Sequence, residues 1–390
     1  MYEKLEALLE ESFDEMVEIR RYLHQHPELS FEETETPKYI AEYHEKLGHS
    51  VRTGVGGRGV VAVLDGALDG PTIALRADFD ALPMQDGKDV SYTSKVPGVT
   101  HACGHDGHTS LLLVLAKAFN RHQDELKGRI VFIHQFAEEV IPGGAISMIE
   151  DGCLNEVDEI YGTHLWATTP LGSVEYTEKE LMASSDSFRI ELQGNGGHGA
   201  QPHKTRDAIL AGSKIVDTLH HLVSRQVDPL DSAVVSIGSF EAENAFNVIA
   251  DSAVLKGTVR TFKVETQNHL IDEIKRAVKA TASAYGVQAD IHYVKGYPAL
   301  INHPENAERV RAASESVKDI ESVILANPQM GGEDFAYYLQ HKPGAFFFTG
   351  AQNPSWETTY PHHHPKFDID ERAMLNGAKV LAKTVIETVQ

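Results

Sequence analysis

The stretch THACGHDGH places three histidines, a cysteine and an aspartate directly before an apolar run with helical character. Thiolate and imidazole groups at this spacing could bind a transition-metal ion. The same stretch could also be an ordinary helix N-terminus with polar capping residues. Cys103, His105 and His108 therefore become candidate metal ligands only if other donors converge on them.

Further donors follow apolar segments elsewhere in the chain. Glu138 and Glu139 come after RIVFIH, and because adjacent side chains point different ways, one could bind a metal while the other faces the substrate. The remaining donors are His164 in YGTHLW, Asp78 and Asp80 in RADFDALP, and His362 to His364 in YPHHHPKFD. Each group alone has an ordinary explanation, such as an exposed loop or a hydrogen-bonded core histidine. All of them fall at or beside predicted strand ends of one sheet, which favours a catalytic site.

The elements that must position these donors alternate between strand and helix. Residues 59–165 are predicted to form an α/β layer with a mainly parallel sheet. Its strands are expected at 59–66, 72–78, 129–136 and 159–166, and its helices from His108 and over 145–151. The spacing of Leu5, Leu8, Leu9, Phe13, Val17 and Leu23 predicts an amphipathic helix at the N-terminus.

Residues 184–297 follow a different order, βαββαβ, which is the split-βαβ arrangement. We expect this segment to be a small domain inserted into the first. The α/β pattern resumes after Pro298, so the predicted domains are 1–183 with 298–390, and 184–297. A length of 390 residues agrees with two hydrophobic cores.

Composition excludes several classes of partner. The formal net charge of -22 should repel phosphate backbones, so we expect no nucleic-acid partner. No secretory leader and no apolar run long enough for a membrane span are visible, which predicts a cytoplasmic protein without a membrane partner. Cys103 and Cys153 are too few for a disulfide framework.

The motifs also resemble a known family. RADFDALP, HACGHDGH, AEE, GGHGAQPH, NVIAD, GTVRTF, GGEDF and HHPKFDIDE are similar, in order and spacing, to the amidohydrolase branch of the aminoacylase and carboxypeptidase family of binuclear metallopeptidases. That branch includes hippurate hydrolases, plant indole-acetyl-amino-acid hydrolases and N-acetyl-diaminopimelate deacetylases. The resemblance runs from about His24 to Glu371. It implies a zinc-exopeptidase-like α/β catalytic domain with an inserted ferredoxin-like domain that serves as lid and dimerisation unit.

The resemblance implies a set of metal ligands: Cys103, His105, Glu139, His164 and His363. Of the three histidines at 362–364, His363 is chosen because the family's ligand stands two residues before the proline, here Pro365. A thiolate, a carboxylate and three imidazoles suit zinc or manganese better than calcium or magnesium, and we expect two divalent ions per chain. Phe136 and Ala250 stand where relatives commonly have proline, but neither change removes a chemical group.

The resemblance also implies roles for residues that are not ligands. Glu138 would act as general base toward a water molecule, and Asp80 would orient a ligand. His198 would stabilise the developing oxyanion, while Asn247 and Arg260 would hold the substrate's carboxylate. From the residues alone, His198 could equally be a turn histidine in water, and Arg260 a surface strand residue.

The expected activity is hydrolysis of the acyl bond of an N-acyl amino acid to a carboxylic acid and a free amino acid. A metallo-dipeptidase or exopeptidase would use the same chemistry with a different pocket. A non-catalytic metal-binding protein and cysteine catalysis by Cys103 are further alternatives, although the spare base Glu138 argues against the former. We also expect a homodimer formed through the inserted domain, with His198 acting in its own or its partner's site.

Overall fold

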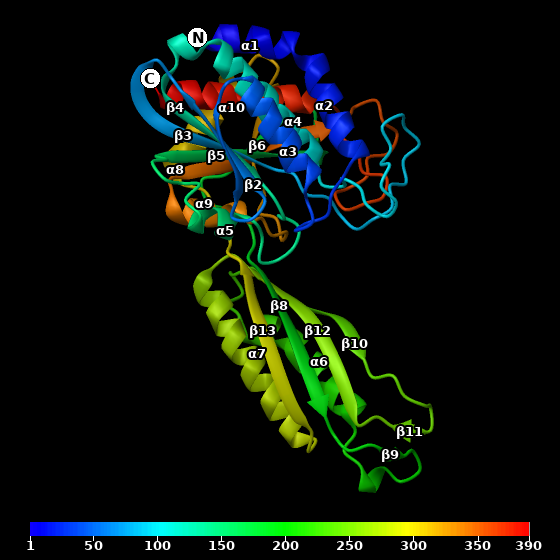
Figure 1. Ribbon diagram of the computed structural model, residues 1–390. Coiled ribbons are helices and arrows are strands. Elements are labelled where there is room, and N and C mark those ends of the chain that lie inside the picture. The colour runs from blue at the N-terminus through cyan, green and yellow to red at the C-terminus, as the bar shows by residue number, and fades with distance from the viewer. Residues whose placement is uncertain (390) are drawn as a thin grey trace. The chain divides into compact units, whose positions relative to one another are not determined.

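The computed structural model describes residues 1–389 (Figure 1). The chain falls into two units. Unit 1 contains residues 1–181, 301–327 and the described residues from 334 on, and unit 2 contains residues 182–300 and 328–333. No helix among residues 1–389 is long and apolar enough to span a membrane.

Unit 1 is built on an eight-stranded mixed sheet with the strand order β1-β2-β4-β3-β5-β16-β6-β15. The strands are β1 (Ser50–Val55), β2 (Gly59–Asp65), β3 (Leu68–Asp78), β4 (Lys127–Gln135), β5 (Glu159–Pro170), β6 (Ser173–Tyr176), β15 (Ser322–Leu325) and β16 (Gly344–Gln352). The neighbours β4, β3, β5 and β16 run parallel, as do β6 and β15. The antiparallel pairs are β1 with β2, β2 with β4, and β6 with β16. The predicted α/β fold with a large sheet is confirmed.

The hairpin of β1 and β2 was not predicted from the sequence. β1 is largely exposed, so it lacks the apolar run that identified the other strands. Gly56 and Gly57 close the hairpin with φ values of 65° and 122°. A side chain would be strained at such angles, and a Cβ on Gly56 would also meet the backbone of Met148 at 2.5 Å. The turn therefore depends on glycine.

Eight helices and one short 3-10 turn are found in the described part of unit 1: α1 (Tyr2–Glu11), α2 (Phe13–Gln25), α3 (Glu35–Lys46), α4 (His105–Arg121), η1 (Gln123–Glu125), α5 (Ala145–Glu150), α8 (Pro304–Ser316), α9 (Phe335–His341) and α10 (Arg372–Thr388). The N-terminal amphipathic helix is in fact two helices, which divide at Ser12. Leu5, Leu9 and Leu23 are buried as expected. The break at Ser12 has no signal in the periodicity of the leucines.

α4 is the central helix of unit 1. It begins at His105, one turn before the expected start at His108, after Gly104 in a left-handed conformation. Every residue over 105–116 is buried. The helix packs against α2, α10 and the sheet, which explains why its sequence is apolar on nearly all sides. Its buried body fixes the position of the loop that carries Cys103.

Unit 2 contains a four-stranded antiparallel sheet with the order β10-β12-β8-β13. In chain order its main elements are β8 (Ser185–Gln193), α6 (Ala208–Gln226), β10 (Ala233–Glu241), β12 (Ser252–Thr261), α7 (Val264–Ala284) and β13 (Gln288–Tyr297). The smaller elements are β9 (Gly197–His198), η2 (Pro202–Lys204) and β11 (Val248–Ile249), and β7 (Glu180–Met182) pairs with β14 (Leu300–Ile301). Alternate residues of β8, namely Phe188, Ile190 and Leu192, are buried in a core shared with α6 and α7.

A chain of three buried histidines joins α3 to the sheet. His44 Nδ1 lies 2.9 Å from His49 Nδ1, and His44 Nε2 lies 2.9 Å from His134 Nε2. His49 Nε2 is 3.2 Å from Asn120 Oδ1, which can only accept a hydrogen bond. His49 therefore donates to Asn120, His44 donates to His49, and His134 donates to His44. All three rings are neutral in this arrangement.

Burial lowers the pKa of His134 to about 3. The unfolded side chain titrates near about 6.5. The unfolded state therefore binds more protons below that pH, and the free energy of unfolding falls as the pH drops from about 6.5 toward 3. Burial also lowers the pKa values of His44 and His49, with further contributions at His44 from His134 and His49.

We predict that His134→Leu reduces the acid sensitivity of folding. Replacing the ring should lower stability at pH 7, because His44 loses a hydrogen-bond donor. It should also remove about 2 kcal/mol of the stability difference between pH 7 and pH 5. Urea denaturation at both pH values measures this difference, with the exposed His341→Leu as control. An unchanged difference in His134→Leu would contradict the assignment.

Candidate metal centre

The sheet of unit 1 brings the candidate donors to one edge. β3 ends at Asp78, and β4 ends at Gln135 just before Glu138 and Glu139. Asp78 and Gln135 are register partners in this parallel pair, so the two strand ends lie side by side. His164 lies on β5, which is the other neighbour of β3. The carboxyl ends of parallel strands are where α/β sheets place their binding sites.

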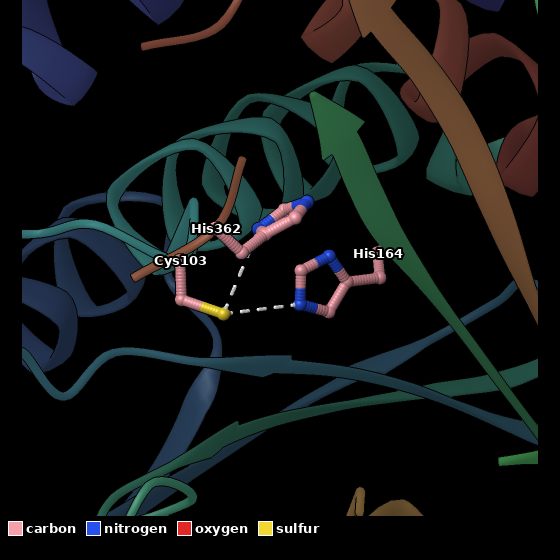
Figure 2. Close-up of side chains that lie close together, drawn as sticks. All are labelled: Cys103, His164 and His362. Carbon is pink, nitrogen blue, oxygen red and sulfur yellow. Dashed lines mark hydrogen bonds between the residues drawn. The ribbon is translucent and has the colours of Figure 1, made fainter. Parts of the chain in front are cut away.

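Cys103 has two histidines beside its sulfur. Figure 2 shows the Sγ atom directed toward the rings of His164 and His362, which come from β5 and from a loop far later in the chain. The sulfur lies 3.4 Å from His164 Nε2 and 3.9 Å from His362 Nδ1. Segments distant in sequence thus meet at one thiol.

His105 and Glu139 complete a second group with Cys103, in which the three ligand atoms lie within 4.8 Å of one another. His105 Nε2 is 3.9 Å from Glu139 Oε1. Both atoms are buried and have no hydrogen-bond partner among residues 1–389. Leaving a buried polar atom unsatisfied costs about 1–3 kcal/mol. A cation between them would satisfy both, so the residues fit a metal.

The ring nitrogens of His105 and His164 are oriented as in metal-binding histidines. His105 Nδ1 donates to the carbonyl oxygen of Asp80 at 2.9 Å, so Nε2 is the nitrogen that would face an ion. His164 Nδ1 donates to the carbonyl oxygen of Leu165 at 3.1 Å, which leaves Nε2 facing Cys103. A ligating histidine normally uses its second nitrogen in this way.

His108 and His362 are held by different hydrogen bonds. His108 Nε2 accepts a hydrogen bond from the backbone N–H of Leu165 at 2.9 Å, and His362 Nε2 accepts one from the backbone N–H of Ala167 at 3.2 Å. The proton of each neutral ring must then be on Nδ1, which in His108 donates to Asp78 Oδ1 at 2.7 Å. Neither ring has a lone pair left for an ion, although both lie within ligand distance of the other donors.

His363, the predicted ligand, lies beside Glu139, whereas His362 and not His363 belongs to the group of ligand atoms around Cys103 and His164. His363 Nε2 lies 3.3 Å from Glu139 Oε2. The residue adopts a left-handed φ of 61°, and its backbone N–H donates to the carbonyl oxygen of Ala102 at 2.8 Å. The choice of His363 as a ligand remains a prediction.

Asp80 connects two of the candidate ligands. Its Oδ1 lies 3.2 Å from His105 Nδ1, and its Oδ2 accepts the backbone N–H of Glu139 at 3.0 Å. The Ser30 hydroxyl also donates to Oδ2, at 2.7 Å. The carboxylate therefore orients the His105 ring and holds the start of the Glu139 side chain at the same time.

Sequence reasoning missed two buried residues that support this edge. Arg76 contacts Asp78 Oδ2 at 2.6 Å and Asp334 Oδ1 at 3.0 Å, and it donates to Gln135 Oε1 at 2.9 Å. Asp334 also accepts the backbone N–H of Ala145 at 3.1 Å. The available signal was a charged residue within the apolar strand TIALRAD, which requires a buried partner.

The electrostatics of the centre favour a bound cation. Burial alone would lower the pKa of His105, but Asp78 and Asp80 outweigh it and raise the pKa to about 10. Burial, together with Glu139 and Glu138, raises the pKa of the Cys103 thiol well above its ordinary value. In both groups the neighbouring carboxylates favour the protonated form, and a bound cation would offset their negative charge.

The three other predicted residues belong to unit 2. His198 on β9 is exposed and pairs in register with Val248 of β11. Asn247 directly precedes β11, and its carbonyl oxygen accepts the backbone N–H of Gly199 at 2.8 Å. Arg260 is partly buried near the end of β12. His198 and Asn247 thus lie on one small ribbon, and the roles of all three residues remain predictions.

Comparison with known proteins decides the family. The model of peptidase family M20/M25/M40 matches residues 74–387. The chain belongs to this family. YhaA of Bacillus subtilis is 55% identical over 386 residues, which cover 99% of this chain and 98% of YhaA. N-acetyl-L-cysteine deacetylase of the same organism is 39% identical over 94% of this chain and 86% of its own length.

A solved structure supports the same assignment. The YXEP protein of Bacillus subtilis, described as a dinuclear metal-binding peptidase of the M20 family, superposes with a TM-score of 0.83 at 35% identity. The match covers 97% of this chain and 99% of that one. The predicted resemblance to a family of metallopeptidases is thereby confirmed. This M20 chain is an enzyme of the amidohydrolase type.

We predict that His363→Gln weakens metal binding and His362→Gln does not. An amide is a poor replacement for an imidazole ligand, so the first change should lower affinity for an ion at least about tenfold. The second change keeps an acceptor for the Ala167 N–H and removes no lone pair directed at an ion. Titration of metal-free protein with zinc or manganese compares the two variants. Equal losses in both would contradict the ring assignments.

Proposed function

We propose that this M20 enzyme hydrolyses N-acyl amino acids to a carboxylic acid and a free amino acid. Two divalent ions, zinc or manganese, would be held by Cys103, His105, Glu139, His164 and His363. The observation that carries the proposal is the buried pair of unsatisfied atoms, His105 Nε2 and Glu139 Oε1, beside the Cys103 thiol. The family and the deacetylase relative support amide hydrolysis as the reaction.

Bound divalent ions supply electrophilic activation of the acyl carbonyl and lower the pKa of a water molecule. Glu138 takes the proton from that water and returns it to the leaving amine. Its carboxylate is buried, and Oε2 lies 4.0 Å from His105 Nε2, close to the ligands without belonging to the Cys103–His105–Glu139 group. Asp80 keeps His105 oriented while the proton moves.

The backbone before Glu138 is held in an unusual conformation that places both glutamates beside His105. Ala137 adopts a left-handed φ of 51°, which costs a residue other than glycine some conformational energy. Glu33 stabilises this conformation, because its buried carboxylate accepts the Ala137 N–H at 2.9 Å. Both carboxylates then lie near His105 Nε2, with Glu139 Oε1 at 3.9 Å and Glu138 Oε2 at 4.0 Å.

Residues 184–297 form, on this proposal, a ferredoxin-like lid and dimerisation domain inserted into the catalytic domain of residues 1–183 and 298–390. Its strand order and its two sheet edges, β10 and β13, support this role. Phe246 is fully exposed beside Asn247, as expected for a residue that a partner covers. His198 stabilises the developing oxyanion, and Asn247 and Arg260 bind the substrate's carboxylate.

Two alternatives differ from this proposal in observable ways. A metallo-dipeptidase would cleave simple dipeptides and leave acetyl, benzoyl and indole-acetyl amino acids intact. A non-catalytic metal protein would bind ions and cleave none of these compounds, but such a site has no use for Glu138. A hydrolysis screen of the metal-loaded protein against both groups of compounds distinguishes the three.

We predict that Glu138→Gln abolishes hydrolysis while the protein keeps its bound ions, because the side chain moves protons and does not bind the metal. The rate should fall by about 10²-fold or more. Metal content and rate are measured on the same preparation, with the exposed Glu150→Gln as control. Wild-type turnover in Glu138→Gln would remove this residue from the mechanism.

A second prediction concerns the homodimer and His198. An inactive Glu138→Gln chain is mixed with an inactive His198→Ala chain under conditions that allow subunit exchange. If His198 serves the partner's site, one site of each mixed dimer contains both wild-type groups and activity returns. Exchange without recovered activity would show that His198 acts in its own chain or outside catalysis.

A further inference from the structure

An arginine outside the proposed ligand set contacts two segments that carry ligands. Arg20 on α2 is completely buried. Its Nε donates to Asp106 Oδ2 at 3.0 Å, and Asp106 directly follows His105. Its other two nitrogens donate to Asp368 Oδ1 at 2.6 Å and Glu371 Oε1 at 3.2 Å, in the segment that follows His363.

His24, one helical turn after Arg20, reinforces the same contact. Its Nδ1 donates to Asp106 Oδ2 at 2.7 Å, and its Nε2 lies 2.8 Å from Lys88 Nζ. Lys88 in turn donates to the carbonyl oxygen of Phe367 at 2.9 Å. The Tyr92 hydroxyl donates to Asp368 Oδ2 at 2.7 Å. Two turns of α2 thus connect the start of α4 with the segment at 367–371.

This connection matters because His363 lies outside regular secondary structure. Residues 353–371 contain no helix or strand, and ordering such a segment costs conformational entropy. Backbone hydrogen bonds hold it at three points, from the N–H of His363 to Ala102 and from the N–H of Gly87 to Pro365, both at 2.8 Å, and from the N–H of Asp370 to Ala351 at 2.9 Å. The carboxylates of Asp368 and Glu371 add side-chain contacts, and among their partners Arg20 is the one that also binds Asp106.

Arginine suits this position better than lysine. Its planar guanidinium carries several donors in fixed directions, so one side chain can bind carboxylates from three places at once. A lysine would keep the charge, but its compact ammonium could not hold all three in the same geometry. Removing the cation entirely would leave the buried Asp106 carboxylate without its full positive charge, held by His24 and the Gly107 N–H, which is costly.

We propose that Arg20 is a positioning residue of the metal centre: by holding Asp106 against Asp368 and Glu371, it sets the separation of His105 and His363 and thereby the affinity for an ion. The inference rests on the ligand set of the proposed function. It assigns Arg20 no contact with substrate or metal.

The test uses Arg20→Lys in the full chain, with Arg21→Lys as matched control. Arg21 is the neighbouring arginine, half exposed, and it binds Glu371 from the solvent side. Metal-free proteins are titrated with manganese or zinc alone, and kcat and KM are measured over a range of metal concentration. We expect Arg20→Lys to lower affinity for an ion by roughly ten- to a hundredfold, and excess metal to restore kcat with KM unchanged. Arg21→Lys should match the wild type.

Asp368→Asn removes the charge at the other end of the same contact. Because the Asp368 side chain is partly exposed, this variant provides a second test if Arg20→Lys fails to fold. It should weaken metal binding in the same direction, while circular dichroism and the melting temperature show a folded protein. Wild-type metal affinity in folded Arg20→Lys or Asp368→Asn, or an equal loss in Arg21→Lys, would overturn the role of Arg20 and leave the proposed function standing. A wild-type protein that binds no metal would overturn both.

Discussion

The buried pair of His105 Nε2 and Glu139 Oε1 imposes the constraint on which the rest of unit 1 depends. Both atoms are buried, and neither has a hydrogen-bond partner among residues 1–389. A fold tolerates such a pair only when a ligand satisfies it or when the surroundings hold it rigidly. The surrounding carboxylates raise the pKa of His105, which shows an excess of negative charge that a divalent cation would neutralise. The chemistry and the electrostatics thus agree.

Rigidity at this end of the sheet comes from hydrogen bonds and ion pairs that fix the candidate ligands and the segments that carry them. Asp80 fixes His105, and backbone groups of β5 fix His108 and His362. Arg76 and Arg20 each form ion pairs with carboxylates from segments far apart in the chain. Buried ion pairs of this kind contribute little net stability, because desolvation offsets their attraction, but breaking one is costly. Their value lies in fixing geometry.

Much of the fold could be predicted because its signals are local. The apolar runs of β2, β3, β4 and β5 and the alternating pattern of β8 each identify a strand without reference to the rest of the molecule. The exposed strand β1 and the break at Ser12 were missed, since neither changes the apolar periodicity. Arg20 and Arg76 were missed for another reason. A buried arginine is recognisable only from carboxylates that tertiary structure brings to it, and the sequence RRYL looks like a solvated helix face.

The sequence by itself determined the chemical types at the site and the family, because donor residues and their order are written directly in the motifs. It placed Glu139 just after one strand, His164 within another, and Cys103 and His105 where a loop enters a helix. Only the tertiary structure decided which histidine rings keep a free lone pair. That choice depends on backbone N–H groups of Leu165 and Ala167, which meet His108 and His362 across the fold and fix their protons on Nδ1. No spacing rule in the sequence contains this information, since a tautomer is set by partners in space.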